Sequence, residues 1–292
     1  MKCFYHSDLD GEAAAATIRL RHGDSFEFVP INYNQHFPIE GISPGEEVWI
    51  ADFTLQEHGM WAALMERTEH VVWIDHHDDA IKRSAEDGTE GLTGLRSSEG
   101  RSGCELAWQF LFPDRIAPFG ICLIGDFDTW RFRYGDLARE FHQGMMVAYD
   151  TRPVEGWEET WKRVFEPDPD LMDEVCGIGL KSLRKQKISD AQDLLSYSFE
   201  ANLWGFRCLV INHNRTGSDY FTSMEAAGYD VYAPVIFDGE RWSVSLYEGP
   251  GIRGKGVHLG EMCHERFGGG GHPGAAGFQC EELPFEIVGR LS

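Results

Sequence analysis

The chain has 292 residues, 42% of them hydrophobic, and a formal net charge of −22 at pH 7. It is long enough to form two domains, each with its own hydrophobic core. Its acidic residues are spread along the sequence, so no basic face is available to hold a long nucleic acid. It has neither an apolar run of about 18 residues that could span a bilayer nor a signal-peptide pattern, which predicts a cytoplasmic protein that does not act at a membrane.

Short apolar segments alternate with helical segments in the first half of the sequence. Five of them are rich in β-branched and aromatic residues and predict strands, at 2–6, 26–33, 46–53, 70–75 and 117–128. Strong helix formers followed by glycine predict a helix over 11–23. Ser102 and Glu105 form a capping box that predicts another helix over 102–112. This alternation is typical of a parallel sheet with helices on both faces.

The remainder of the chain predicts a connector and a second, smaller domain. The connector is polar and helical in pattern, with a break at "EPDPD" near 166–170. After it come three segments that predict strands and then a glycine-rich run, at 203–214, 229–238, 241–249 and 268–277. We therefore predict an α/β protein with a parallel-sheet domain over 1–153, a helical connector over 154–200 and a smaller α/β domain over 201–292.

Acidic residues and histidines gather where the predicted strands of the first domain end. The four groups are His6, Asp8 and Asp10; Asp52; Asp75, His76 and His77; and Asp126 with Asp128. A single Asp at such a place is commonly a turn residue or a helix N-cap. In an open α/β sheet, however, the ligand crevice lies beyond the carboxyl ends of the strands, where all four groups fall. Carboxylates mixed with imidazoles suit Mn²⁺ or Mg²⁺, with Zn²⁺, Fe²⁺ or Co²⁺ as alternatives, and the number of acids indicates two ions.

The ordered set of motifs resembles a known family. The motifs are His6-x-Asp8-x-Asp10-Gly11, Asp52, Asp75-His76-His77, Asp128-Thr129 and the late "GGGGHPGAAGF" at 268–278. In this order they resemble the DHH phosphoesterase superfamily with a DHHA1 C-terminal domain, over nearly the whole chain. The compact length and "GDFDTWRF" are most similar to the nanoRNase B branch, which contains small oligoribonucleases and cyclic-nucleotide phosphodiesterase-like proteins.

The resemblance implies a role for each matching residue of the first domain. One divalent ion would be held by His6 and Asp8, the other by Asp10, His76 and Asp128, and Asp52 would bridge them. Mn²⁺ is the expected ion, with Mg²⁺ or Co²⁺ as alternatives. Asp75 and His77, the candidate catalytic residues here, would either support the metal ligands or lie near the reacting phosphate, with Asp75 orienting an imidazole. Of the two acids in the fourth motif, Asp128 is favoured because Thr129 follows it, and Asp126 is left as a supporting or capping residue.

The second domain is expected to hold the substrate. Backbone amides of Gly269, Gly270 and Gly271 can approach an anion closely, and His272 would act on the substrate beside them. A flexible turn with a surface histidine is the alternative interpretation of this run.

Three further residues are candidates for contacting a nucleotide. Arg253 lies in a loop that also contains Lys255, and Arg101 just precedes a predicted helix. Both could bind phosphate, although an ordinary solvated loop also accounts for Arg253. Trp130 follows the fourth motif and could stack on a base. A rival zinc site of His258, Cys263, His264 and Cys280 has a spacing that fits no common finger.

These features together predict a metal-dependent phosphoesterase. It would hydrolyse short oligoribonucleotides (nanoRNA) or dinucleotides to mononucleotides, using water activated by two metal ions. A 3′-phosphoadenosine 5′-phosphate phosphatase and a cyclic (di)nucleotide phosphodiesterase are alternatives. A catalytically inactive nucleotide-binding scaffold is an alternative of another class. The expected partner is a short RNA or small nucleotide rather than a long nucleic acid, and homodimerisation stays open.

Overall fold

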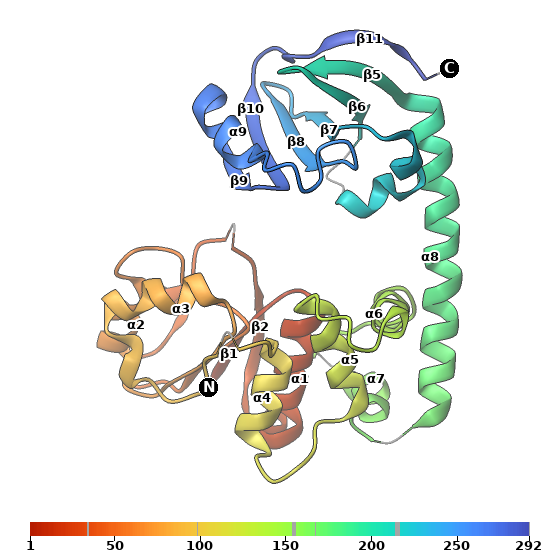
Figure 1. Cartoon of the computed structure of the whole chain (residues 1–292). Coiled ribbons are helices and arrows are strands. Elements are labelled where there is room, and N and C mark those ends of the chain that lie inside the picture. Colours follow the sequence, from red (N-terminus) through yellow and green to blue (C-terminus); the bar gives the residue numbers. More distant parts are fainter. Residues whose placement is uncertain (34, 98, 154–155, 167, 214–216, 292) are drawn as a thin grey trace. The chain divides into compact units, whose positions relative to one another are not determined.

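The computed structural model describes the chain except residues 34, 98, 154–155, 167, 214–216 and 292 (Figure 1). The chain divides into two compact units, Met1–Leu183 and Arg184–Ser292. The long helix α8 (Pro169–Tyr197) contributes residues to both. Each unit is described by itself.

The first unit is built on a four-stranded parallel sheet. Its strands are β1 (Lys2–His6), β2 (Glu27–Ile31), β3 (Val48–Ala51) and β4 (Val71–Ile74), in the order β2-β1-β3-β4. The chain leaves β1 for β2 on one side and then crosses to β3 on the other. The strand order therefore reverses between β1 and β3, and such a reversal opens a crevice at the carboxyl ends of the strands.

Both faces of this sheet are buried, which confirms the predicted α/β class. Neighbouring residues of β1 point to opposite faces: Tyr5 joins one core with Trp49 and Ile74, and Phe4 joins another with Ile50 and Trp73. The helices of the unit that precede α8 are α1 (Leu9–His22), α2 (Met60–Arg67), α3 (Asp78–Ser84), α4 (Gly103–Leu111), α5 (Phe119–Asp128), α6 (Asp136–Ala148) and α7 (Trp157–Phe165).

One predicted strand is wrong: residues 117–128 contain helix α5. The middle of the segment is apolar, and its buried residues point to different sides of the helix: Gly120, Ile121, Leu123 and Ile124. A helix buried on all sides lacks the 3.6-residue period that distinguishes it from a buried strand, and only its length of ten residues or more favours the helix. The fourth acidic group therefore ends a helix and not a strand.

The helix-start signals were more reliable. Helix α4 begins with the predicted capping box, in which both Ser102 and Glu105 make their hydrogen bonds. Helix α1 begins at Leu9, two residues before the predicted start, because the Asp8 carboxylate accepts a hydrogen bond from the Gly11 amide and so caps the helix.

The second unit contains a seven-stranded mixed sheet in the order β11-β5-β6-β7-β8-β10-β9. Its elements after α8 are β5 (Ser198–Leu203), β6 (Phe206–Asn212), β7 (Val231–Phe237), β8 (Trp242–Glu248), α9 (Leu259–Phe267), β9 (Gly270–His272), β10 (Ala275–Cys280) and β11 (Glu286–Arg290). The three strands predicted in this part correspond to β6, β7 and β8. The glycine run becomes the β9–β10 hairpin.

Short 3₁₀ segments complete the secondary structure, at Gly23–Ser25, Ile39–Gly41, Ala85–Asp87, Thr89–Gly91 and Ser218–Ala227. All seven cysteines are free, and six of them are buried. In the part of the chain that the structure describes, no helix is both long and apolar enough to cross a membrane.

Candidate metal centre

The residues after β1 are fixed by the start of helix α1 and by a second helix. His6 ends β1, and its Nδ1 lies 2.7 Å from Asp8 Oδ2. Asp10 is 2% exposed, and its carboxylate accepts hydrogen bonds from the Gly103 amide (2.6 Å) and the Cys104 amide (3.1 Å). These two amides form the N-terminus of α4, where the helix dipole favours an anion. The structure therefore buries Asp10 with its charge compensated.

Asp52 follows β3 directly and occupies the centre of the group. It is 1% exposed and has φ of 53°, a left-handed backbone that is uncommon for a residue other than glycine. Its Oδ1 lies 3.2 Å from His76 Nε2, and its Oδ2 lies 3.9 Å from His6 Nδ1. A Cβ atom at Gly103 would lie 2.6 Å from Asp52 Oδ1, so only glycine fits beside this carboxylate.

The three residues after β4 point in two directions. Asp75 is fully buried, and its Oδ1 accepts hydrogen bonds from the backbone amides of His76 (2.7 Å) and His77 (3.2 Å). The same oxygen lies 2.8 Å from His77 Nδ1. His76 turns toward the acids, with its Nε2 3.4 Å from Asp128 Oδ2 and 3.9 Å from Asp10 Oδ2. Asp75 thus orients the His77 imidazole, while His76 joins the acidic group.

The two acids of the fourth motif have different surroundings. Asp128 is the last residue of α5 and belongs to the group around His76. Asp126 is 1% exposed, and its carboxylate accepts hydrogen bonds from the amides of Arg133 (3.0 Å) and Tyr134 (3.1 Å). Asp126 therefore fixes the loop after α5 instead of facing the other acids.

The charges of this group are poorly balanced by the protein. Burial and the neighbouring acids Asp10 and Asp8 raise the pKa of Asp128 to about 8. The same effects raise the pKa of Asp52 well above its usual value, and burial lowers that of His76. Burial is the largest single effect on His77 and opposes its charge, but the hydrogen bond to Asp75 and the negative charges of Asp75, Asp128 and Asp10 together raise its pKa.

Buried atoms without a well-formed hydrogen bond indicate that this donor set fits divalent cations. His6 Nδ1 and Asp52 Oδ1 are buried and make no hydrogen bond of good geometry, although Asp8 Oδ2 lies 2.7 Å from the first and His76 Nε2 lies 3.2 Å from the second. Such atoms are costly unless something satisfies them. Among the residues that the structure describes, three groups have metal-ligating spacing: His6, Asp8 and Asp52; Asp10, His76 and Asp128; and Asp52, His76 and His77. Asp52 belongs to the first and the last of these groups, which share no other residue, as expected for a carboxylate that bridges two ions. Oxygen and imidazole ligands suit Mn²⁺ and Mg²⁺.

Tyr33 was missed by the sequence analysis. Its ring packs against His6 and Phe53, each at 5.0 Å between centroids, and its hydroxyl lies 3.4 Å from His77 Nδ1. Tyr33 lies two residues beyond β2, at the same edge of the sheet as the acids. This position after a strand could have indicated a site residue, but tyrosine is not a usual ligand of Mn²⁺ or Mg²⁺.

The predicted substrate residues of the second unit are less closely grouped than the predicted metal ligands of the first. The amides of Gly268 and Gly269 donate to the His264 and Cys263 carbonyls at the end of α9. Gly270, Gly271 and His272 form β9, which pairs with β10, and His272 is exposed. Arg253 is paired with Glu225 at 3.1 Å. Arg101, in the first unit, is exposed next to the N-cap of α4.

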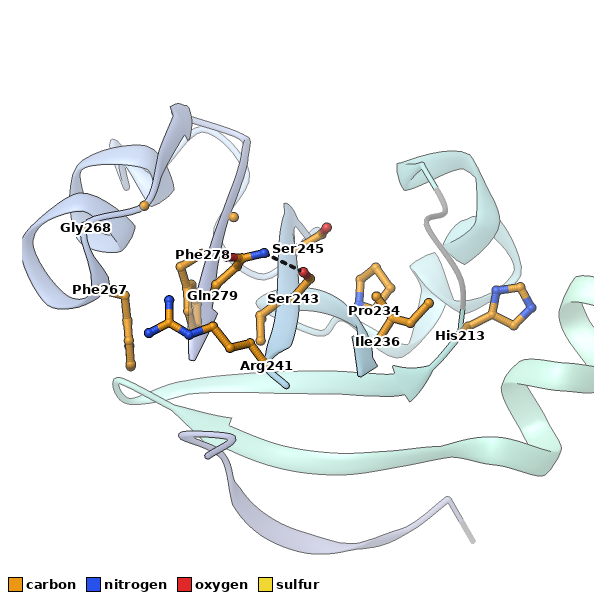
Figure 2. A pocket seen from close by; sticks show the side chains of 13 residues that line it. His213, Pro234, Ile236, Arg241, Ser243, Ser245, Phe267, Gly268, Phe278 and Gln279 are labelled. Atoms are coloured by element: carbon orange, nitrogen blue, oxygen red, sulfur yellow. Dashed lines mark hydrogen bonds between the residues drawn. The ribbon is translucent and has the colours of Figure 1, made fainter. Parts of the chain in front are cut away.

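A cavity of about 640 Å³ lies within the second unit, over β7, β8 and β10 (Figure 2). Arg241, Ser243 and Gln279 supply polar groups to its wall, and Gln279 donates a hydrogen bond to Ser243. Gly268 and Gly269 also line it. Neither His272 nor Arg253 is among its lining residues. Among the described residues, none of His258, Cys263, His264 and Cys280 belongs to a group with metal-ligating spacing, which removes the support for the zinc alternative.

Comparison with known proteins bears on the fold. No family model and no curated protein matches the sequence. The structure is similar to that of a pGpG-specific phosphodiesterase, PggH, from Vibrio cholerae, with a TM-score of 0.57 and 12% identity over 96% of this chain and 93% of that one. It is also similar to a DHH domain from a protein described as a member of a family of ribosomal proteins, with a TM-score of 0.54 and 14% identity over 98% of this chain and 82% of that one.

Fold and site first define a class: α/β proteins with a cluster of carboxylates and imidazoles at the carboxyl edge of a parallel sheet. Within that class, the chain has the DHH fold, as the order of its motifs predicted.

Proposed function

We propose that this chain is a metal-dependent phosphoesterase that hydrolyses short oligoribonucleotides or dinucleotides to mononucleotides. The observation that carries the proposal is the position of Asp52. Its buried carboxylate has one oxygen that makes no hydrogen bond of good geometry, and it is shared between the group of His6 and Asp8 and the group of His76 and His77. A carboxylate in this position is suited to bridging two divalent ions.

In this proposal His6 and Asp8 hold one ion, Asp10, His76 and Asp128 hold the other, and Asp52 joins the two sites. Mn²⁺ is the expected ion, with Mg²⁺ or Co²⁺ as alternatives. When bound, such a pair supplies a hydroxide at neutral pH and neutralises charge on the phosphoryl oxygens. Asp10 is already held by the α4 amides, so its position does not depend on the ions.

His77 is proposed to handle a proton. Its Nδ1 lies against Asp75 Oδ1, which leaves Nε2 as the nitrogen that can face a substrate. The hydrogen bond to Asp75 favours the imidazolium form of His77, from which the ring can donate a proton to a phosphoryl or leaving-group oxygen. His77 also belongs to a group with Asp52 and His76, so binding a metal is its alternative role.

The second unit is proposed to bind the rest of the nucleotide. His272, Gly269, Gly270, Gly271 and Arg253 remain the proposed contacts there, and Arg101 is a further phosphate contact in the first unit. The cavity beside Gly269 adds Arg241, Ser243 and Gln279, whose side chains can bind ribose or phosphate. A net charge of −22 disfavours long polyanions. The fold is shared with a protein named for cleaving the dinucleotide pGpG, which is in line with a dinucleotide substrate.

The test is a hydrolysis panel with purified protein and added Mn²⁺, analysed by chromatography. The substrates are a 5′-phosphorylated dinucleotide, an RNA of roughly two dozen nucleotides, a cyclic dinucleotide and 3′-phosphoadenosine 5′-phosphate. The dinucleotide should react fastest, and Asp52→Asn should abolish the reaction. Undiminished turnover by Asp52→Asn would point to a contaminating nuclease.

Each other outcome selects an alternative. Fastest turnover of the cyclic dinucleotide or of 3′-phosphoadenosine 5′-phosphate would replace the proposed substrate with that one. Binding of nucleotides without hydrolysis of any substrate, in protein shown by elemental analysis to contain metal, would favour the inactive scaffold.

A further inference from the structure

The loop between α5 and α6 holds two large aromatic residues in an unusual backbone conformation. Trp130 has φ of 54° and Phe132 has φ of 46°. Side chains with a Cβ atom rarely occupy this left-handed region, and bulky ones are outliers there. Such strain persists only where the surrounding structure imposes it, and it is concentrated at functional sites.

Hydrogen bonds of the neighbouring residues hold this conformation. The Asp126 carboxylate accepts the amides of Arg133 and Tyr134. The Arg131 guanidinium donates to the Gly100 carbonyl at 2.6 Å and to Glu105 at 2.7 Å. The loop is thereby tied to the start of α4, which also carries the amides that bind Asp10.

The strained backbone does not bury the Trp130 side chain. Its side chain is 64% exposed, the highest value among the exposed tryptophans, tyrosines and phenylalanines of unit Met1–Leu183 in the described residues. Phe132 meets the indole edge-to-face at 5.5 Å, and the Arg139 guanidinium lies 4.0 Å from the Phe132 centroid. Arg139 also lies over the indole itself, 5.7 Å from the ring centroid, but these contacts leave most of the aromatic surface in solvent.

Trp130 is also close to the candidate metal centre along the chain. It follows Asp128 by two residues, so their Cα atoms are within about 7.6 Å of each other. A base on a nucleotide whose phosphate lies at Asp128 is only a sugar away from that phosphate. The indole is therefore within reach of such a base.

We propose that Trp130 is the stacking surface for the base of the nucleotide whose phosphate lies at the metal centre. The placement of that phosphate rests on the proposed function. Because every base has a π-face, such a surface accepts different bases and adds affinity without reading sequence. Stacking of one base on an aromatic side chain corresponds to a gain of about fivefold to 150-fold in affinity.

The experiment compares two ligands that differ in the base. Adenosine 5′-monophosphate and ribose 5-phosphate are titrated into the protein by calorimetry, with Mg²⁺ present and ionic strength fixed. Wild-type protein should bind the nucleotide at least about fivefold more tightly than the sugar phosphate. Trp130→Asn should remove this preference, because asparagine tolerates the left-handed backbone but has no ring, and Trp130→Phe should keep most of it.

Tyr134→Asn is the matched control. Tyr134 belongs to the same loop, is 43% exposed and is held by a backbone hydrogen bond that the substitution retains. Its loss should leave the preference for the nucleotide unchanged. The melting temperature of Trp130→Asn should not fall, since the side chain is mostly in solvent and the new residue suits the backbone better.

Two results would overturn the proposal: equal binding of the two ligands by wild-type protein, or a preserved preference in Trp130→Asn. A preserved preference together with a changed oligomeric state in that variant would assign the exposed indole to a subunit contact instead. The measurement is independent of turnover. An inactive enzyme that still prefers the nucleotide would contradict the proposed function alone, and an active enzyme without the preference would contradict the stacking alone.

Discussion

Asp126 and Asp128 lie two residues apart at the end of α5 and have opposite surroundings. Asp126 bonds to backbone amides of the next loop, whereas Asp128 faces His76 and raises the density of negative charge around Asp52. The sequence alone favoured Asp128 only through the following Thr129. The assignment of Asp128 as a metal ligand remains a proposal, and the two surroundings predict effects of substitution that separate activity from stability.

Asp128→Ala should lower the rate of hydrolysis by at least about 100-fold. The substitution removes a proposed metal ligand, and with it part of the electrostatic stabilisation of the reacting phosphate. The melting temperature of this variant in metal-free buffer at about pH 8 or above should stay the same or rise, since the ionised Asp128 carboxylate is repelled there by the neighbouring acids. Asp126→Ala should instead lower the melting temperature by several degrees, because it leaves two loop amides unpaired at about 1–3 kcal/mol each. Rates and melting curves of both variants check this, and the reverse pattern would show that the fourth motif is misassigned.

The raised pKa of Asp128 predicts how metal-free protein responds to pH. With a folded pKa of about 8 against an ordinary value of 3.8, the protonated carboxyl favours the folded state. This contribution is fully present below the ordinary value and is lost as pH rises through about 8. The melting temperature in chelator should therefore fall between about pH 5 and pH 8, most steeply between about pH 5 and pH 7 and less steeply as the pH approaches 8.

Excess Mn²⁺ should reverse this dependence, because bound ions require ionised carboxylates and stabilise the folded state more at higher pH. Asp128→Asn is the control and should flatten the curve in chelator. A melting temperature that rises with pH in metal-free wild-type protein would show that another group dominates.

At the scale of elements, helix α4 supports the candidate site from its first turn. The amides of Gly103 and Cys104 bind Asp10, and Gly103 leaves room for the Asp52 carboxylate. This helix contributes none of the proposed metal ligands. Its effect on the site is therefore indirect and passes through the positions of two carboxylates.

Gly103→Ala should displace Asp52, because the new Cβ atom would lie 2.6 Å from Asp52 Cβ. We expect a loss of metal affinity of about 10–100-fold, as found when residues that support metal ligands are changed. Gly177→Ala is a matched control: it lies in α8 with no atom within 4 Å of the new Cβ, and it should raise stability by about 0.5–1 kcal/mol. Calorimetric titration with Mn²⁺ measures the metal affinity of both variants, and thermal melting measures the stability of Gly177→Ala. An unchanged affinity in Gly103→Ala would contradict the role of this helix.

The elements also show how far the sequence could be interpreted. The strand ends at His6, Asp52 and Asp75 were predictable because period and composition define short buried strands. Helix α5 was not, since burial on every side erases the helical period. The β9–β10 hairpin was hidden by glycines, whose strand pairing comes from backbone partners in β8 and β10 and leaves no side-chain pattern. Tyr33 was passed over because its contribution is packing.

At the scale of the whole molecule, the charge of −22 limits the substrate. A nuclease for long strands gains affinity with each phosphate that a basic residue neutralises. In this chain each phosphate beyond the site meets a repulsive field instead. The electrostatics thus complement the proposal of a short substrate.

Catalytic efficiency should accordingly fall, on the order of tenfold, as RNA grows from two to about five nucleotides. Single-turnover rates over a length series at fixed salt measure this. The decline should become smaller at higher ionic strength, where repulsion is screened. A rate that holds or rises up to a long RNA would identify a processive nuclease.

Cys104 gives the molecule a built-in reporter of motion. Its amide binds Asp10, its thiol is fully buried, and burial raises the thiol pKa well above its usual value. Such a thiol resists alkylation while α4 is docked and reacts only when the helix opens. The rate at which reagent modifies Cys104, located by mass spectrometry, therefore reports how often the support of Asp10 comes apart, and a ligand that closes the site should slow that rate.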